Sequence, residues 1–341
     1  MTDPTLVGTT AAIFGIAGHE LSPDEGAFFR DADPFGFILF ARNVETPDQL
    51  RRLTNDLRAC VGRDVPIFVD QEGGRVQRLR SPHWAEWLPP LDAVSHAMAL
   101  GGQDAAARMM YLRYRLIAQE LHHAGIDGNC APCLDLATPL THPFLWNRCF
   151  STHPMQVALL GRAVADGLMA GGVLPVIKHM PGHGRAMADT HHDLPVVTTD
   201  LATLMNTDFA PFADLSDLPL AMTAHIVFSA VSAKPATSAP AMIRLIRECL
   251  RFDGLLMTDD LNMQALRGSP SERTRRAIRA GCDIALFCKG TLRQMQAVAA
   301  AAGPMGAVTI RRAQAALACR RPPDAIDIAA LRAEHLSLLG G

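Results

Sequence analysis

The chain has 341 residues, 49% of them hydrophobic, so it can bury a sizeable core. Its formal net charge of −2 gives no basic surface of the kind that nucleic-acid-binding proteins carry. There is no apolar run of membrane-spanning length, and no Lys or Arg precedes Arg30 to form the basic region of a secretory signal. We therefore expect a cytoplasmic protein with no nucleic-acid or membrane partner, and the charge and apolar content are compatible with a monomer.

The eight cysteines show no regular disulfide framework, which favours a reducing compartment. Cys130 and Cys133 form one C-x-x-C pair, but no second pair completes a zinc site. We interpret both as small buried residues.

Short apolar segments recur along the chain, and helix-like amphipathic segments follow most of them. The predicted strands span residues 10–16, 36–40, 66–69, 126–132, 174–178, 218–224, 254–258 and 283–287. The clearest predicted helices span residues 46–59, 104–123, 154–169 and 238–250. Thr46-Pro47 and Thr152-His-Pro154 are suitable helix starts.

Eight strands alternating with helices predict an α/β fold with a parallel sheet, and eight is the number that closes a (β/α)₈ TIM-type barrel. A doubly wound sheet is disfavoured because no Gly-rich dinucleotide motif follows the first strand. No segment resembles a linker. We predict a single domain over residues 1–341, with the barrel at about 8–304 and extra C-terminal helices at about 305–341.

Polar residues follow the predicted strands at their carboxyl ends, where the active sites of such barrels lie. They are Asp70-Gln71-Glu72, Asp135, Lys178-His179, His225 and Asp259-Asp260, with Arg148 in the loop after the fourth strand.

Asp259 directly follows a predicted strand, so its carboxylate would stand at the mouth of the barrel. A partly buried carboxylate needs donors or cations, which Lys178, Arg78 and Arg148 could supply. One interpretation is a nucleophile. The other is an acid that caps a helix over residues 261–267, and two consecutive acids allow both roles.

The segment Asp70-Gln-Glu-Gly-Gly-Arg-Val-Gln-Arg78 also starts at a strand end. An Asp and an Arg together suit hydrogen bonding to vicinal hydroxyls or to a carboxylate. The alternative is an Asp–Arg pair that only holds the loop in place.

The loop after Lys178-His179 carries His183, Asp189, His191, His192 and Asp193. In an extended loop Asp189 and His191 face the same way, so Asp189 can fix the tautomer of His191 and raise its basicity. This predicts an acid/base dyad. A solvated loop is the alternative, and His192 fits that description.

Together these motifs resemble glycoside hydrolase family 3, and specifically its single-domain bacterial β-N-acetylhexosaminidases. The matching segments cover most of the predicted barrel. They are Gly36-Phe-Ile-Leu-Phe-Ala-Arg-Asn43, Asp70-Gln-Glu-Gly-Gly-Arg-Val-Gln-Arg78, Asn129 with Ala131-Pro-Cys-Leu-Asp135, Asn147-Arg148-Cys-Phe150, Lys178-His-Met-Pro-Gly-His-Gly184, Asp189-Thr-His191, Met222-Thr-Ala-His225 and Thr258-Asp-Asp-Leu-Asn-Met263.

The resemblance implies a retaining mechanism through a covalent glycosyl-enzyme. It implies that Asp259 is the nucleophile and that His191, with Asp189 as its partner, is the acid/base. The positions implied to bind the sugar are Asp70, Arg78, Arg148, Lys178 and His179. A His donor suits this chemistry because its unperturbed pKa of about 6.5 allows proton transfer in both directions near neutrality.

The resemblance further implies a substrate and a role. The substrate would be a muropeptide with terminal N-acetylglucosamine, cleaved in the cytoplasm during peptidoglycan recycling. No metal or other cofactor is expected.

Three positions depart from the family pattern. Cys149 stands where Ser is usual, Met180 stands where Phe is usual, and the variable stretch before the dyad holds Arg185. We hypothesise that Arg185 contacts an anionic aglycone.

Three alternatives remain. A metal-dependent hydrolase could use the loop histidines, but the sequence has no H-x-H after the first strand. A β-N-acetylglucosaminide phosphorylase is nearer, since a neutral His acid/base does not repel phosphate. A non-catalytic sugar-binding protein would need neither nucleophile nor dyad.

Overall fold

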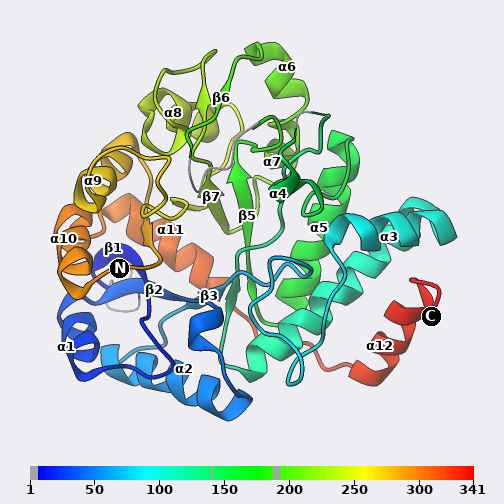
Figure 1. Cartoon of the computed structure of the whole chain (residues 1–341), viewed down its shortest axis with the longest axis horizontal. Coiled ribbons are helices and arrows are strands. Elements are labelled where there is room, and N and C mark those ends of the chain that lie inside the picture. Colours follow the sequence, from blue (N-terminus) through cyan, green and yellow to red (C-terminus); the bar gives the residue numbers. More distant parts are fainter. Residues whose placement is uncertain (1–6, 140, 187–192) are drawn as a thin grey trace.

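Eight parallel strands form a barrel at the centre of the molecule (Figure 1). The computed structural model describes residues 7–139, 141–186 and 193–341. The hydrogen-bonded order is β10-β1-β2-β3-β4-β5-β7-β9. A parallel bridge from Met257, in β9, to Ile284, just before β10, closes the ring. The predicted (β/α)₈ barrel is therefore confirmed.

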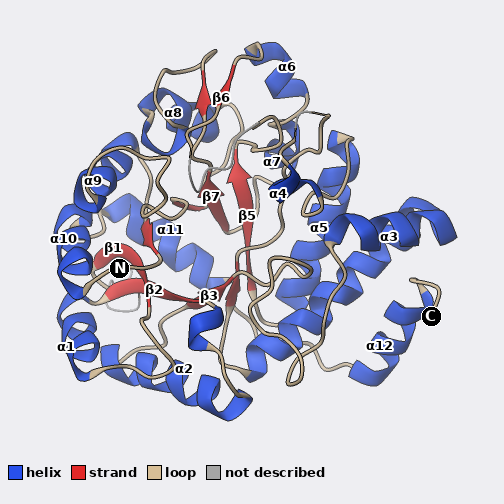
Figure 2. Ribbon diagram, in the orientation of Figure 1, coloured by secondary structure: helices blue, strands red, loops and turns tan. Residues whose placement is uncertain are grey.

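Each barrel strand lies within, or overlaps, one of the eight predicted segments. The strands are β1 (Thr10–Gly15), β2 (Pro34–Leu39), β3 (Ile67–Val69), β4 (Gly128–Asn129), β5 (Leu174–Met180), β7 (Leu220–Thr223), β9 (Leu255–Met257) and β10 (Ala285–Phe287). Every residue of these strands is buried, as parallel strands covered by helices require. Figure 2 shows the strands ringed by helices.

The surrounding layer is helical, and several helices begin where the sequence predicts. The helices of this layer are α1 (Pro23–Ala32), α2 (Pro47–Val61), α3 (Pro90–His123), α5 (Pro154–Ala170), α8 (Pro240–Glu248), α9 (Pro270–Ala280) and α10 (Leu292–Ala302). Thr46 caps α2, because its hydroxyl accepts a hydrogen bond from the Gln49 amide at 3.2 Å.

Helix α3 is broken near the start of the predicted helix 104–123. Gly102 has φ +72° and ψ −161°, a conformation outside the helical region that a glycine adopts without strain. Helix α3 packs against α5.

Shorter elements lie in the loops. They are η2 (Ala41–Asn43), α4 (Pro143–Trp146), α6 (Leu201–Asn206), α7 (Ala210–Asp214), η3 (Ala236–Ser238) and the paired strands β6 (Val196–Val197) and β8 (Val227–Phe228).

The C-terminal stretch forms two helices, α11 (Ala307–Ala318) and α12 (Ile328–Ser337). Arg312 of α11 binds Asp283, just before β10, and Asp253, just before β9, which fastens α11 to the barrel. Helix α12 packs against α3 at the edge of the molecule (Figure 1). Among the described residues no helix has the length and apolar character needed to cross a membrane.

Candidate active site

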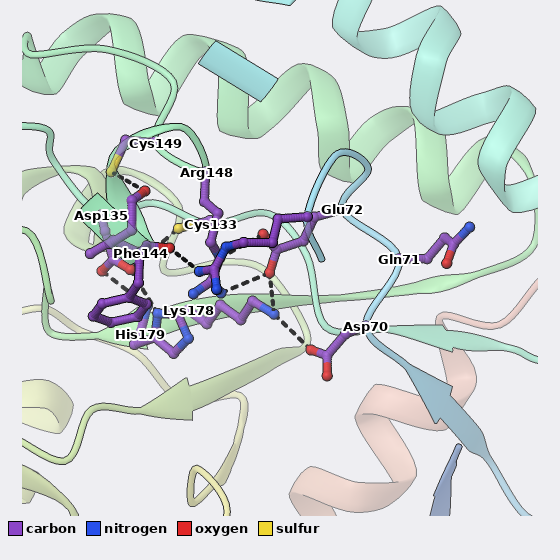
Figure 3. Close-up of polar contacts among 12 residues, drawn as sticks. Asp70, Gln71, Glu72, Cys133, Asp135, Phe144, Arg148, Cys149, Lys178 and His179 are labelled. Carbon is purple, nitrogen blue, oxygen red and sulfur yellow. Dashed lines mark hydrogen bonds and ion pairs between the residues drawn. The ribbon is translucent and has the colours of Figure 1, made fainter. Parts of the chain in front are cut away.

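A cavity of about 230 Å³ opens at the carboxyl ends of the barrel strands. Its wall brings together all the predicted sugar-binding residues and the predicted nucleophile. These residues are Asp70, Arg78, Arg148, Lys178, His179 and Asp259. They come from the ends of β3, β5 and β9 and from the loops that follow β3 and β4, and only closure of the barrel makes them neighbours. Figure 3 shows Asp70, Arg148, Lys178 and His179 of this set.

Lys178 is the centre of the charged cluster in this cavity. It lies in β5, is 1% exposed, and its Nζ binds Asp70 Oδ1 at 2.8 Å and Glu72 Oε1 at 2.6 Å. Burial would lower the pKa of Lys178, but the two carboxylates outweigh it and raise that pKa. The ammonium group is therefore charged and held in one place.

Two arginines complete the cluster. Arg148 makes a bidentate pair with buried Glu72, at 2.9 Å from both Nε and Nη2, and Arg78 Nη2 binds Asp70 Oδ2 at 3.1 Å. Burial would raise the pKa of Glu72, but Arg148 and Lys178 lower it to about 2. Asp70 likewise has its pKa held well below the usual range by Lys178 and Arg78 against the effect of burial. Both acids are ionised at neutral pH.

Asp135, after β4, organises the histidines on the other side of Lys178. Its Oδ2 lies 2.7 Å from His179 Nδ1, and its Oδ1 accepts from the backbone amides of His179 at 3.2 Å and His183 at 2.7 Å. The bond to Asp135 orients the His179 ring so that its other nitrogen is free to face the cavity. Burial lowers the pKa of His183 to about 4, so this imidazole is neutral at pH 7.

Cys133, Asp135 and His179 could offer three ligand atoms to a metal ion, since these atoms lie within 4.8 Å of one another. The Cys133 thiol, however, donates to Asp135 Oδ2 at 3.3 Å, so Asp135 already accepts four hydrogen bonds from protein groups. A hydrogen-bonded network accounts for this arrangement. Cys130 and Cys133 are both buried, as predicted.

Asp259 lies two residues after the end of β9 and lines the cavity. Burial would raise the pKa of its carboxyl, but His225, His179, the Asp260 amide and Lys178 together lower it. The Asp260 amide donates to Asp259 Oδ1 at 2.8 Å. The Asp259 carboxylate is therefore ionised at neutral pH, which a nucleophile requires.

Asp260 has a different environment. Its Oδ1 accepts from the backbone amides of Asn262 at 3.0 Å and Cys288 at 3.1 Å, and burial raises the pKa of its carboxyl to about 6. The alternative in which one of the two acids caps a helix over residues 261–267 is wrong. Turns occupy this stretch, and the next helix is α9. Asp260 instead fixes the turn that follows the strand.

Arg78 and Arg148 line the same cavity as Asp259, but their ion pairs are with other acids. Arg78 pairs with Asp70 and Arg148 with Glu72, because these acids lie on the neighbouring β3 loop and present their carboxylates to the two guanidinium groups. The charge of Lys178, the third of these cations, helps to lower the pKa of Asp259.

Arg185 lies in the loop after β5, and its Nε donates to Asp208 Oδ2 at 2.6 Å. Asp208 is 2% exposed, so this pair is largely shielded from solvent. The charge of Arg185 is directed to Asp208, and contact between Arg185 and an anionic aglycone stays a prediction.

The predicted dyad, Asp189 and His191, lies outside the described residues, as does His192. The loop that leads to it is well anchored. Gly184 passes so close to the Leu136 carbonyl oxygen that a Cβ would lie 1.8 Å from it, and its own carbonyl accepts from the Thr141 hydroxyl at 2.5 Å.

Sequence reasoning did not assign a role to Glu72 or Asp135, although both were noted at strand ends. One indication of a role for Glu72 was visible in the sequence, because two acids, Asp70 and Glu72, follow β3 two residues apart. Nothing in the sequence shows that Glu72 and Asp135 are 1% and 0% exposed, and this burial is what makes them supports of the site.

Glu72 is expected to contribute to the pH dependence of stability. Its folded-state pKa of about 2 lies below its ordinary 4.5, so its contribution is fully present above pH 4.5 and is lost as the pH falls towards 2. In Glu72→Gln the free energy of unfolding should therefore fall less steeply in this window, by up to about 1.4 kcal/mol per pH unit. Urea unfolding at several pH values measures this slope.

Glu86→Gln is the matched control, because Glu86 is half-exposed and pairs with the exposed Arg80. Its slope should equal that of the unmodified protein. An unchanged slope in Glu72→Gln would contradict the assignment of Glu72 as an ionised buried acid.

Comparisons with known proteins agree with this geometry. Residues 29–318 match the family model described as the glycosyl hydrolase family 3 N terminal domain. A beta-hexosaminidase of Bordetella avium is 36% identical over 293 residues, which cover 84% of this chain and 82% of that protein. A beta-hexosaminidase of Methylococcus capsulatus is 35% identical over 281 residues, covering 81% and 82%.

A similar solved structure is that of NagZ from Neisseria gonorrhoeae in complex with N-trifluoroacetyl-D-glucosamine. It is 30% identical, has a TM-score of 0.86, and the match covers 98% of both chains.

Proposed function

Because this chain belongs to glycosyl hydrolase family 3 and is a glycoside hydrolase, we propose that it is a retaining exo-β-N-acetylglucosaminidase. In this proposal Asp259 is the nucleophile, and His191, oriented by Asp189, is the acid/base. The sugar is held by Asp70, Arg78, Arg148, Lys178 and His179.

The observation that carries the proposal is the ionised Asp259 carboxylate in the wall of a charged cavity. A retaining glycosidase needs one carboxylate to attack the anomeric carbon and a proton donor for the leaving oxygen. The attack forms the bond from a carboxylate oxygen to the anomeric carbon as the bond to the aglycone breaks. A water then releases the sugar while the acid/base takes its proton.

The cluster around Lys178 suits recognition of sugar hydroxyls. Asp70 offers carboxylate acceptors, while Lys178 and Arg78 offer charged donors, and all three are fixed by mutual ion pairs. Fixed donors and acceptors lose little entropy when they bind a hydroxyl group. The cavity of about 230 Å³ is smaller than pockets for drug-sized ligands, which supports binding of one terminal sugar.

The sugar is proposed to be N-acetylglucosamine, since the neighbouring NagZ structure holds a derivative of glucosamine. The resemblance of the motifs supports a muropeptide as the substrate and peptidoglycan recycling in the cytoplasm as the setting. The single-domain organisation and the monomeric state belong to the same proposal.

Trapping the glycosyl-enzyme tests the proposal. The protein is incubated with a 5-fluoro N-acetylglucosaminyl reagent, and its intact mass is measured. An adduct that maps to Asp259 and is missing in Asp259→Asn is expected. Hydrolysis of an aryl N-acetylglucosaminide without any adduct would overturn the assignment of Asp259 as the nucleophile. If the protein forms no adduct and also hydrolyses nothing, the result would favour a sugar-binding protein. Faster cleavage with phosphate than without it would favour the phosphorylase.

His191→Ala is expected to lower kcat/KM by about 10²–10⁴-fold for N-acetylglucosaminides whose leaving group needs a proton. The loss should be much smaller with a 2,4-dinitrophenyl leaving group, which departs without protonation. Steady-state kinetics with the two substrates measure the difference. His192→Ala is the matched control and should change kcat/KM only a few-fold. Equal losses of His191→Ala on both substrates would argue against a general acid.

A further inference from the structure

A second cavity, of about 280 Å³, lies outside the barrel between α3, the loop that precedes it and α12. Most of its wall is apolar, and the apolar side chains come from all three segments. They are Trp87, Leu88, Leu116, Leu336 and Leu339. Two basic side chains, Arg113 and His335, are buried in this wall. Neither belongs to the active site described above.

Arg113 is a buried cation without a matching anion. It is 1% exposed, and its Nη2 donates to the carbonyl oxygens of Glu72 at 2.8 Å and Leu88 at 2.6 Å. The rings of Trp87 and Tyr114 lie 5.7 and 5.8 Å from its guanidinium carbon. Across residues 7–139, 141–186 and 193–341, no carboxylate lies within ion-pair distance of Arg113. Carbonyls and rings solvate the cation but do not neutralise it, and an uncompensated buried charge is costly.

Three acids lie near this site, and among the described residues none of them forms an ion pair with Arg113. Glu120 accepts from the Ala85 amide at 3.2 Å, and its charge is closest to that of Arg332 at the rim. The Glu72 carboxylate binds Arg148 and Lys178 and acts on Arg113 only from beyond ion-pair distance. Glu86 lines the cavity but is half-exposed and pairs with Arg80 at 2.9 Å. The second cavity therefore has an unmet positive charge in its wall.

Three nitrogens in the wall have no hydrogen-bond partner within the described chain. They are Nε of Arg113, Nε2 of His335 and Nε1 of Trp87, all in side chains that are less than a tenth exposed. The His335 ring stands edge-on to Trp87, with ring centres 5.5 Å apart. Burial lowers the pKa of His335 to about 4, so at pH 7 the imidazole is neutral and can donate one N–H. Buried polar groups are normally satisfied, so a wall with three such nitrogens, two of them on the basic side chains Arg113 and His335, indicates a ligand.

We propose that this cavity binds a small carboxylate that carries an apolar tail. The carboxylate faces Arg113 and His335 and supplies the missing negative charge, while the tail lies against Trp87, Leu116 and the leucines of α12. A bare inorganic anion would leave the apolar wall unfilled, and a neutral alkane would leave the Arg113 and His335 nitrogens unsatisfied. Arg332, exposed at the rim, adds a favourable charge for an approaching anion.

Octanoate is the probe, with octan-1-ol as the matched neutral ligand, and binding is measured by isothermal titration calorimetry at pH 7. We expect a Kd for octanoate of roughly 0.1–1 mM, with octan-1-ol bound about 10-fold more weakly or not at all. Saturating N-acetylglucosamine should leave the octanoate Kd unchanged, because the two cavities are separate. Octan-1-ol binding as tightly as octanoate, or displacement of octanoate by N-acetylglucosamine, would overturn the proposal.

Two variants locate the site. Leu339→Trp fills the cavity from its half-buried wall, and Arg113→Met removes the cation while keeping an apolar chain of similar length. Both variants should raise the Kd for octanoate by at least about 10-fold, and Arg113→Met should leave the Kd for octan-1-ol unchanged. Met155→Trp, on the exposed face of α5, is the control and should bind octanoate normally. If Arg113→Met does not fold, Leu339→Trp alone decides: an unchanged Kd in that variant would overturn the proposal.

Discussion

Replacing Asp259 by Asn is expected to lower kcat/KM for an aryl N-acetylglucosaminide by roughly 10⁴-fold or more, since removal of a catalytic nucleophile costs losses of this order. An amide keeps the shape of the side chain and can still accept from the Asp260 amide, so the fold should be retained. It cannot attack the anomeric carbon, because it lacks the negative charge. Steady-state kinetics measure the loss, and circular dichroism verifies the fold.

Asp260→Asn is the matched control, one residue along the same turn. The Asp260 carboxylate accepts from two backbone amides and its pKa is raised to about 6, so an amide oxygen can take over these contacts. We expect a loss of less than about 10-fold, as for a residue that supports the site without taking part in the chemistry. A larger loss in Asp260→Asn than in Asp259→Asn would mean that the nucleophile is assigned to the wrong acid.

Lys178→Met is expected to lower both stability and activity. The substitution leaves Asp70 and Glu72 without the cation that lies 2.8 and 2.6 Å from them. Breaking a buried ion pair by removing one partner costs about 3–5 kcal/mol, because the remaining charge stays buried. Since Lys178 is also proposed to donate to a sugar hydroxyl, kcat/KM should fall by about 100-fold, as expected for a lost hydrogen bond to a charged group.

Arg80→Met is the control for the stability part. Arg80 and Glu86 form a pair of similar length, 2.9 Å, but both are about half-exposed, so its loss should cost no more than about 1 kcal/mol. Urea unfolding compares the two variants. A cost for Lys178→Met as small as that for Arg80→Met would show that solvent, and not the ion pair, stabilises the two carboxylates.

The sequence predicted the strands well because their signal is local. The first part of β5, Leu174–Ile177, is apolar and short and follows turn residues, and these properties depend only on near neighbours. Helix starts are equally local, and Thr46 caps α2 through an amide three residues away. The prediction failed after Asp259, where residues 261–267 form turns. There Asp260 accepts from the Cys288 amide, a contact across 28 residues that no local pattern reveals.

By itself, therefore, the sequence determined the barrel, the strand ends at which polar residues gather, and the family motifs. The tertiary structure decided which charged side chains lie close enough to form ion pairs. Lys178 pairs with Asp70 across 108 positions and Arg148 pairs with Glu72 across 76. Arg113 lines a cavity and has no ion-pair partner among the residues that the structure describes. The physical reason is that ion pairing and burial depend on distances set by closure of the barrel and by packing of α12 on α3. Alternation and capping act within a few residues, so they specify the elements but not the partners that those elements bring together.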